Sequence, residues 1–123
     1  MNLPQQRSSL ILDTNIVIYV ENKTTWGNKY IPLLHGKELC IGFMTVAELL
    51  EYAFHKKMSE RSVQRLKDRL KRNYLILPFA EDTCENFGKI RSERRNRPIS
   101  VPDALIAATA LSYDLPLVTH NKS

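Results

Sequence analysis

Cysteine is rare in this sequence, with two residues among 123, and neither the cysteines nor the three histidines have the spacing of a zinc site. Cys40 and Cys84 are too few for a disulfide framework, so we expect reduced thiols and a cytoplasmic protein. Long apolar runs are missing as well, since none approaches the roughly 20 residues of a membrane span. The N-terminal residues carry one positive side chain, and Asp13 interrupts their apolar run, so we expect no secretion signal.

Repeats, low-complexity segments and interdomain linkers are also absent from the sequence, which favours a single domain. The hydrophobic content of 43% and the charged content of 25% are typical of a globular protein that buries a core. The net charge of +5 permits a polyanionic partner without requiring one.

Short apolar runs alternate with helical stretches along the chain, which indicates an α/β fold with a mainly parallel sheet. Ligands of such sheets bind at the carboxyl ends of the strands, near the point where the strand order reverses. The predicted strands are 9–13, 39–43, 74–79 and 115–120, and the predicted helices are 14–22, 24–37, 44–57, 59–73, 81–97 and 100–114.

Three carboxylates, those of Asp13, Glu48 and Asp103, stand at the entrances of three predicted helices. Each has a simple explanation as a helix cap. Asp13 is a suitable N-cap, and Thr45-x-x-Glu48 and Ser100-x-x-Asp103 both match the capping box. Capping is the commonest use of an acid at such a position when each one is considered alone.

Capping does not explain why three such acids occur at equivalent places, because in a parallel sheet they would converge at one edge. Two like charges about 4 Å apart repel by about 4 kcal/mol at an effective dielectric constant near 20, whereas a cap contributes only about 1 kcal/mol. A cluster of carboxylates therefore needs a cation. Oxygen ligands alone suit a hard ion such as Mg²⁺ or Mn²⁺, which is suited to phosphoryl hydrolysis.

Four segments in order carry a family resemblance: "LILDTNIVIYV", "MTVAELLEYA", "ISVPDALIAATAL" and "LPLVTHN". With them the chain resembles the PIN-domain ribonucleases, and especially the VapC-type toxins of toxin–antitoxin pairs. The resemblance implies one PIN-like domain over residues 1–123, with a three-layer α/β/α fold and a mainly parallel central sheet of four or five strands. Family members usually continue with a further acid and an aromatic residue, so we expect the C-terminal end to be truncated or incomplete relative to the family.

The resemblance also implies a catalytic quartet that binds one or two divalent cations, Mg²⁺ or Mn²⁺. Asp13, Glu48 and Asp103 match its first three acids, and Asn121 matches the fourth position as an amide. Because Asn121 is neutral, we expect one tightly held ion. By the same resemblance, the metal ligands are Asp13, Asp103 and Glu48, while Asn15 and Thr119 hold water or phosphate around them.

The activity that this resemblance implies is hydrolysis of RNA phosphodiester bonds by a metal-dependent endoribonuclease. The expected substrate is tRNA, rRNA or mRNA, and the expected inhibitor is a cognate VapB-type antitoxin. Family members commonly form homodimers, and we expect the same here. Operator DNA is expected to be contacted only through the antitoxin, and no membrane is involved.

Basic residues just before the third acid allow two interpretations. Arg94, Arg95 and Arg97 either form a phosphate clamp that binds RNA beside the metal site or belong to a solvated surface. Tyr52 and His55 could line the substrate groove or face the antitoxin or a second subunit. Residues 65–72 are expected to be an exposed helix face with ion pairs four residues apart.

Two other enzyme-like classes and one binding class compete with the nuclease. A haloacid-dehalogenase-type phosphatase needs a second Asp two residues after Asp13, where this sequence has Asn15. A phosphoacceptor receiver module needs paired acids at the first strand, and "LILDTN" lacks the pair. The remaining alternative is a non-catalytic PIN-like module that binds RNA or protein and retains the acids as elements of its fold.

Overall fold

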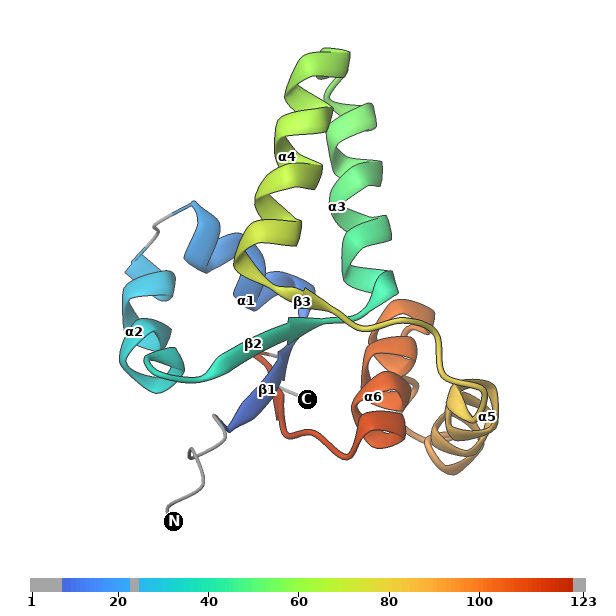
Figure 1. Cartoon of the computed structure of the whole chain (residues 1–123). Coiled ribbons are helices and arrows are strands. Elements are labelled where there is room, and N and C mark those ends of the chain that lie inside the picture. The colour runs from blue at the N-terminus through green and yellow to red at the C-terminus, as the bar shows by residue number, and fades with distance from the viewer. Residues whose placement is uncertain (1–7, 23–24, 121–123) are drawn as a thin grey trace.

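The computed structural model of the protein describes residues 8–22 and 25–120, a part of the chain that contains four strands and six helices (Figure 1). The predicted alternation of strands and helices is confirmed throughout this part. The elements are β1 (Ser9–Leu12), α1 (Thr14–Glu21), α2 (Thr25–Leu34), β2 (Glu38–Ile41), α3 (Phe43–His55), α4 (Glu60–Asn73), β3 (Leu75–Ile76), α5 (Thr83–Glu93), α6 (Val101–Tyr113) and β4 (Leu117–Val118).

The four strands form one sheet with the order β3-β2-β1-β4, and every neighbouring pair is parallel. Ile11 of β1 is in register with Cys40 of β2 on one side and with Leu117 of β4 on the other. The chain moves from β1 outward to β2 and β3, and then returns to place β4 on the opposite side of β1. The strand order therefore reverses between β1 and β4, where a ligand site is expected.

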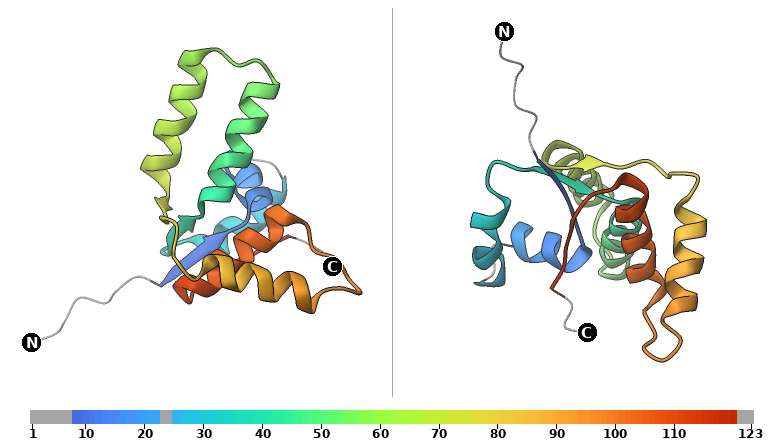
Figure 2. Two further views of the ribbon diagram at one scale, coloured as in Figure 1. Left: turned by 90° about the vertical axis from the view of Figure 1, so that its right-hand side faces the viewer. Right: turned by 90° about the horizontal axis from the view of Figure 1, so that it is seen from below.

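Helices cover both faces of the sheet, which gives the expected three-layer arrangement. Figure 2 shows α1 and α2 on one side of the strands and α5 and α6 on the other. The helices α3 and α4 run side by side as a hairpin that projects from the carboxyl edge of β2 (Figure 1). This hairpin gives the molecule a protruding arm next to the end of the sheet.

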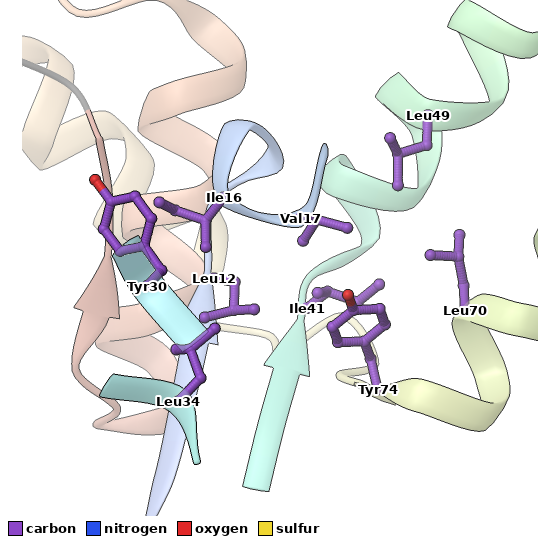
Figure 3. Close-up of a cluster of buried hydrophobic side chains, with 9 residues drawn as sticks. All are labelled: Leu12, Ile16, Val17, Tyr30, Leu34, Ile41, Leu49, Leu70 and Tyr74. Carbon is purple, nitrogen blue, oxygen red and sulfur yellow. The ribbon is translucent and has the colours of Figure 1, made fainter. Parts of the chain in front are cut away.

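Alternating residues along β1 and β2 divide the interior into two apolar clusters. Leu12 and Ile41 point to the side of α1–α4, where the larger cluster forms (Figure 3). Ile11 and Cys40 point the other way and pack with α6 residues such as Ala110. The members of the larger cluster are Leu12, Ile16, Val17, Tyr30, Leu34, Ile41, Leu49, Leu70 and Tyr74.

The start of α3 differs from its prediction. The helix begins at Phe43 with Gly42 as the N-cap residue, so Thr45 lies inside the first turn and the capping box with Glu48 is wrong. A Cβ atom at Gly42 would stand 3.3 Å from Cγ2 of Thr109 on α6. The absence of a side chain at Gly42 lets the start of α3 lie close against α6.

The later elements are shorter than predicted. Of the predicted strand 74–79 only Leu75–Ile76 is a strand, and of 115–120 only Leu117–Val118. Proline lies beside each strand and has no N–H for the ladder, which limits the pairing. The helix predicted over 81–97 ends at Glu93, and Arg94 begins the loop that leads to α6.

Candidate active site

Asp13 follows β1 directly and is 4% exposed, with both carboxylate oxygens engaged. Oδ1 accepts a hydrogen bond from the backbone N–H of Ile16 at 2.9 Å, which confirms Asp13 as the N-cap of α1. Oδ2 accepts a hydrogen bond from the hydroxyl of Thr119, just beyond β4, at 2.5 Å. The bond from Thr119 joins the carboxyl ends of β1 and β4, and the bond from Ile16 ties the same carboxylate to the start of α1, so the carboxylate is fixed at the point where the strand order reverses.

The end of β4 is itself held in place by aromatic residues that the sequence analysis did not single out. The hydroxyl of Tyr30 on α2 lies 2.5 Å from Nδ1 of His120, and Tyr19 contacts the His120 ring edge-on. Because His120 is next to Thr119, these contacts hold the chain that presents the Thr119 hydroxyl to Asp13.

Glu48 lies in the second turn of α3, where a hydroxyl that the sequence analysis missed fixes its orientation. The Thr14 hydroxyl donates a hydrogen bond to Oε1 of Glu48 at 2.6 Å, and its oxygen lies 3.1 Å from the hydroxyl oxygen of Thr45. Thr45 is fully buried, so it supports Thr14 from the interior instead of capping α3. The only signal in the sequence was the position of Thr14, directly after Asp13 and first in α1.

Asp103 enters the site from the first turn of α6. Ser100 is the N-cap, and its hydroxyl oxygen accepts a hydrogen bond from the backbone N–H of Asp103 at 3.2 Å, as the sequence predicted. Pro102 occupies the first turn, where its missing N–H has no helical partner to lose. The cap bond is donated by the backbone N–H of Asp103.

The three acids line one open pocket of about 480 Å³ at the carboxyl edge of the sheet. A neighbouring hollow of about 430 Å³ shares Asp13 and Asp103, so these two carboxylates stand between the two spaces. The acid pocket is lined by Asp13, Thr14, Asn15, Ile18, Glu48, Leu49, Glu51, Tyr52, His55 and Asp103.

The described part of the chain contains no group of three His, Cys, Asp or Glu side chains already placed to hold a metal ion together. Asp13, Glu48 and Asp103 line a common pocket without forming such a group. Their chemistry still fits a hard divalent cation, because the pocket offers carboxylate oxygens from three separate elements, with hydroxyl and amide groups beside them.

The remaining predicted residues lie at different places. Asn15 is exposed and lines the acid pocket. Arg94 lines the neighbouring hollow, where its Nε donates a hydrogen bond to the backbone oxygen of Arg97 at 3.2 Å. Arg95 and Arg97 are exposed and line neither space. Asn121 lies outside the described residues.

Neither cysteine belongs to this pocket, and both are free thiols. Cys40 is buried on β2, where burial and, to a smaller extent, the charge of Glu38 raise the pKa of its thiol. Cys84 is exposed on α5. A thiol with a raised pKa is a poor nucleophile, so cysteine chemistry is not the chemistry of this site.

The fold and the pocket together define a class of protein: a parallel α/β domain with carboxylates gathered at the switch point of its sheet. None of the helices within 8–22 and 25–120 is long and apolar enough to cross a membrane. A model of the PIN domain matches residues 10–123, and the chain belongs to the PIN-domain family. Nucleases of this family generally depend on divalent metal ions.

Several of the similar proteins are named VapC or VapBC. The chain is 33% identical to ribonuclease VapC1 of Haemophilus influenzae (strain R2866) over 115 residues, which cover 90% of this chain and 85% of the relative. It is 33% identical to the tRNA(fMet)-specific endonuclease VapC of Shigella flexneri over 114 residues, with the same coverage. Among solved structures, VapBC-1 from nontypeable Haemophilus influenzae has a TM-score of 0.73 at 32% identity and covers 92% of this chain and 87% of that one.

Proposed function

We propose that this protein is a divalent-metal-dependent endoribonuclease and the toxin of a VapBC-type toxin–antitoxin system. The observation that carries the proposal is the placement of Asp13, Glu48 and Asp103, from three separate elements, around one pocket at the carboxyl edge of the sheet. The relatives named as VapC ribonucleases, each at about one third identity over most of the chain, support the same activity.

The metal ligands in this proposal are Asp13 and Asp103, with Glu48 binding directly or through a water molecule. The ion is Mg²⁺ or Mn²⁺, because the pocket offers oxygen donors and none of the cysteines. A bound divalent cation in such a site supplies charge neutralisation on the phosphate and lowers the pKa of coordinated water. The protein fixes the orientation of its ligands, because backbone and hydroxyl donors hold the carboxylates of Asp13 and Glu48.

Neighbouring polar residues position these acids and the substrate. Thr119 and Thr14 orient Asp13 and Glu48 through the hydrogen bonds described above. Asn15, at the pocket wall, and Asn121, beyond the described residues, are assigned to holding water or a phosphate oxygen. With Asp13, Glu48 and Asp103, Asn121 completes the proposed catalytic set.

Among the three arginines considered for phosphate binding, the geometry favours Arg94. Its side chain lines the hollow that shares Asp13 and Asp103 with the acid pocket, and its bond to the Arg97 oxygen fixes the guanidinium. A phosphate in that hollow would receive a charge-assisted hydrogen bond from Arg94. Arg95 and Arg97 are exposed away from both spaces, and their role in RNA binding is limited to general attraction.

Partners follow from the same assignment. The solved structures that resemble this chain include VapBC complexes, among them VapBC2 from Rickettsia felis bound to a DNA fragment from the promoter, which has a TM-score of 0.73 at 27% identity. We infer a VapB-type antitoxin as the inhibitor of this chain, with operator DNA contacted through the antitoxin. We also infer a homodimer, whose mass is measured by light scattering. The substrate is an RNA such as tRNA, rRNA or mRNA.

The direct test is an RNA cleavage assay with protein purified free of antitoxin. Total tRNA and rRNA fragments are incubated with Mg²⁺ or Mn²⁺, with EDTA in a parallel reaction and with Asp103→Asn as the inactive variant. Cleavage by the wild-type protein with metal alone supports the proposal. Intact RNA under all conditions refutes it and favours the non-catalytic binding module.

A further inference from the structure

The positive charge of this protein is concentrated in one arm of the fold. Residues 56–73, which form the tip of the α3–α4 hairpin and the whole of α4, contain eight basic and two acidic residues and carry a net charge of +6. The whole chain carries +5, so the remaining residues sum to −1. The arm projects from the body of the molecule next to the carboxyl edge of the sheet (Figure 1). A polyanion is therefore attracted more strongly to residues 56–73 than to the rest of the protein.

All four arginines of α4 lie on one face of the helix. They are separated by four, four and three residues, a spacing that keeps side chains on one side of an α-helix. Val63 and Leu70 are buried against the interior, on the opposite side of α4. We call the exposed side the arginine face, and its members are Arg61, Arg65, Arg69 and Arg72.

Most of this face is not neutralised by acids. Arg69 pairs with Glu21 at 3.1 Å, but the ion pairs four residues apart that the sequence predicted within α4 are not formed among the described residues. Asp68, one of the two acids of α4, accepts a hydrogen bond from Gln64 at 2.9 Å. Ion-pair partners are absent from the described part of the chain for three exposed arginines: Arg61, Arg65 and Arg72.

The arginine face is connected to the acid pocket through a space of about 140 Å³ between α1, α3 and α4. Arg69 lines this space, which shares Ile18, Leu49 and Tyr52 with the acid pocket. Tyr52 is 57% exposed at the junction, and Nζ of Lys56 lies 5.7 Å from the centre of its ring. An RNA strand that leaves the acid pocket on this side would therefore pass the exposed ring of Tyr52 and the side chain of Lys56 before it reaches the arginine face.

We propose that Arg61, Arg65 and Arg72 bind phosphates of the RNA to one side of the cleaved bond, so that substrate contacts extend from the acid pocket along α4. This inference rests on the proposed function for the identity of the polyanion. The planar guanidinium group suits phosphate oxygens, and the three arginines extend over about 16 Å of helix, enough for several nucleotides. Recognition by phosphate contacts is independent of base sequence, so α4 supplies affinity and orientation, not choice of the cleaved bond.

The test compares two triple variants that lower the net charge by the same amount. Arg61→Gln/Arg65→Gln/Arg72→Gln removes the arginine face, and Lys29→Gln/Lys37→Gln/Lys89→Gln removes three lysines elsewhere. Binding of fluorescein-labelled total tRNA is measured in EDTA, where no cleavage is expected, across a range of salt concentrations. We expect the arginine variant alone to lose affinity by about tenfold or more, and its salt dependence to flatten by about 2 in the log–log slope.

Arg61→Lys/Arg65→Lys/Arg72→Lys serves as a folding and charge control and should retain most of the binding. Equal loss in both glutamine variants, or unchanged binding in the arginine variant, overturns the inference. Impaired binding of a co-purified partner protein with unchanged tRNA affinity also overturns it and assigns the face to a protein. Because binding is measured without cleavage, the two proposals can fail separately: a protein that binds tRNA through α4 but cuts none refutes the proposed function and retains phosphate binding along α4, without its relation to a cleaved bond.

With an active enzyme, the expected signature is a raised KM for tRNA at an unchanged kcat, because α4 does not touch the reacting atoms. An equal loss of kcat in the arginine variant contradicts a role confined to binding.

Discussion

Asp13 has two tasks that substitution can separate. As the N-cap of α1 it accepts a hydrogen bond from Ile16, and as a member of the acid pocket it supplies negative charge. Asp13→Asn retains an oxygen acceptor for the cap but removes the charge. Asp13→Ala removes both. The two variants therefore distinguish a structural carboxylate from a metal ligand.

The hydrogen bonds of Asp13 set the expected loss of stability in each variant. Loss of the cap costs about 1 kcal/mol, and loss of the hydrogen bond from Thr119 to a charged acceptor adds about 1.5 kcal/mol. With an unfolding entropy of roughly 2.1 cal/mol/K per residue, 1 kcal/mol corresponds to about 4 °C in this chain. Without metal, we expect Asp13→Ala to lower Tm by about 10 °C. Asp13→Asn should stay within about 4 °C of wild type, because it retains the cap and weakens only the Thr119 bond; relief of repulsion between the acids is common to both variants and does not change their order.

Differential scanning fluorimetry in EDTA and in Mn²⁺ measures both properties, with RNA cleavage measured in parallel. Wild-type protein should gain stability with Mn²⁺, by about 2.7 kcal/mol at a hundredfold excess over the dissociation constant. Both Asp13 variants should lose this gain and at least 100-fold in cleavage rate. If Asp13→Asn unfolds as readily as Asp13→Ala, or cleaves RNA at the wild-type rate, the separation of tasks is wrong.

Three further predictions concern the supports of the site and the thiols. Thr14→Val removes the hydroxyl that orients Glu48, and cleavage should fall by roughly 10- to 100-fold while the circular dichroism spectrum is unchanged; wild-type activity would show that Glu48 needs no support. Ser100→Ala removes the cap of α6 and should lower Tm by about 4 °C, with Ser100→Thr restoring most of it; an equal loss in both variants would exclude the hydroxyl as the cause. At pH 8, iodoacetamide should label Cys84 and not Cys40, whose thiol is buried with a raised pKa, and mass spectrometry of peptides reads the result directly. Equal labelling of both in folded protein would mean that β2 opens readily.

Local patterns in the sequence were sufficient for much of this fold. Apolar runs alternating with helical stretches predicted every strand and helix of the described part. This was possible because the spacing of apolar residues and the residues that cap helices are local signals, each contained within a few positions. Asp13 and Ser100 are N-caps as predicted, since each needs only a side-chain oxygen and the following turn. The placement of the three acids around one pocket also followed once the sheet was taken as parallel, although they do not form the close cluster that was expected.

Tertiary packing accounts for what the sequence did not reveal. Gly42 is the N-cap of α3 and lies against Thr109 of α6, and this contact between residues far apart in the chain cannot be recognised from the sequence around Thr45. The hydrogen bond from Thr14 to Glu48 joins residues 34 positions apart, and the bond from Thr119 to Asp13 joins residues 106 apart. The charge on α4 was visible in the sequence, but its lack of neutralising pairs depends on side-chain positions in three dimensions.

The central claim is that Asp13, Glu48 and Asp103 together hold the divalent ion on which RNA cleavage depends. Diffraction from crystals soaked in Mn²⁺, recorded where manganese scatters anomalously, measures this most directly. The account predicts an anomalous peak in the pocket bounded by the three carboxylates, and its loss in Asp103→Asn crystals treated identically. A peak at another place, or none at a Mn²⁺ concentration that supports cleavage, would contradict it.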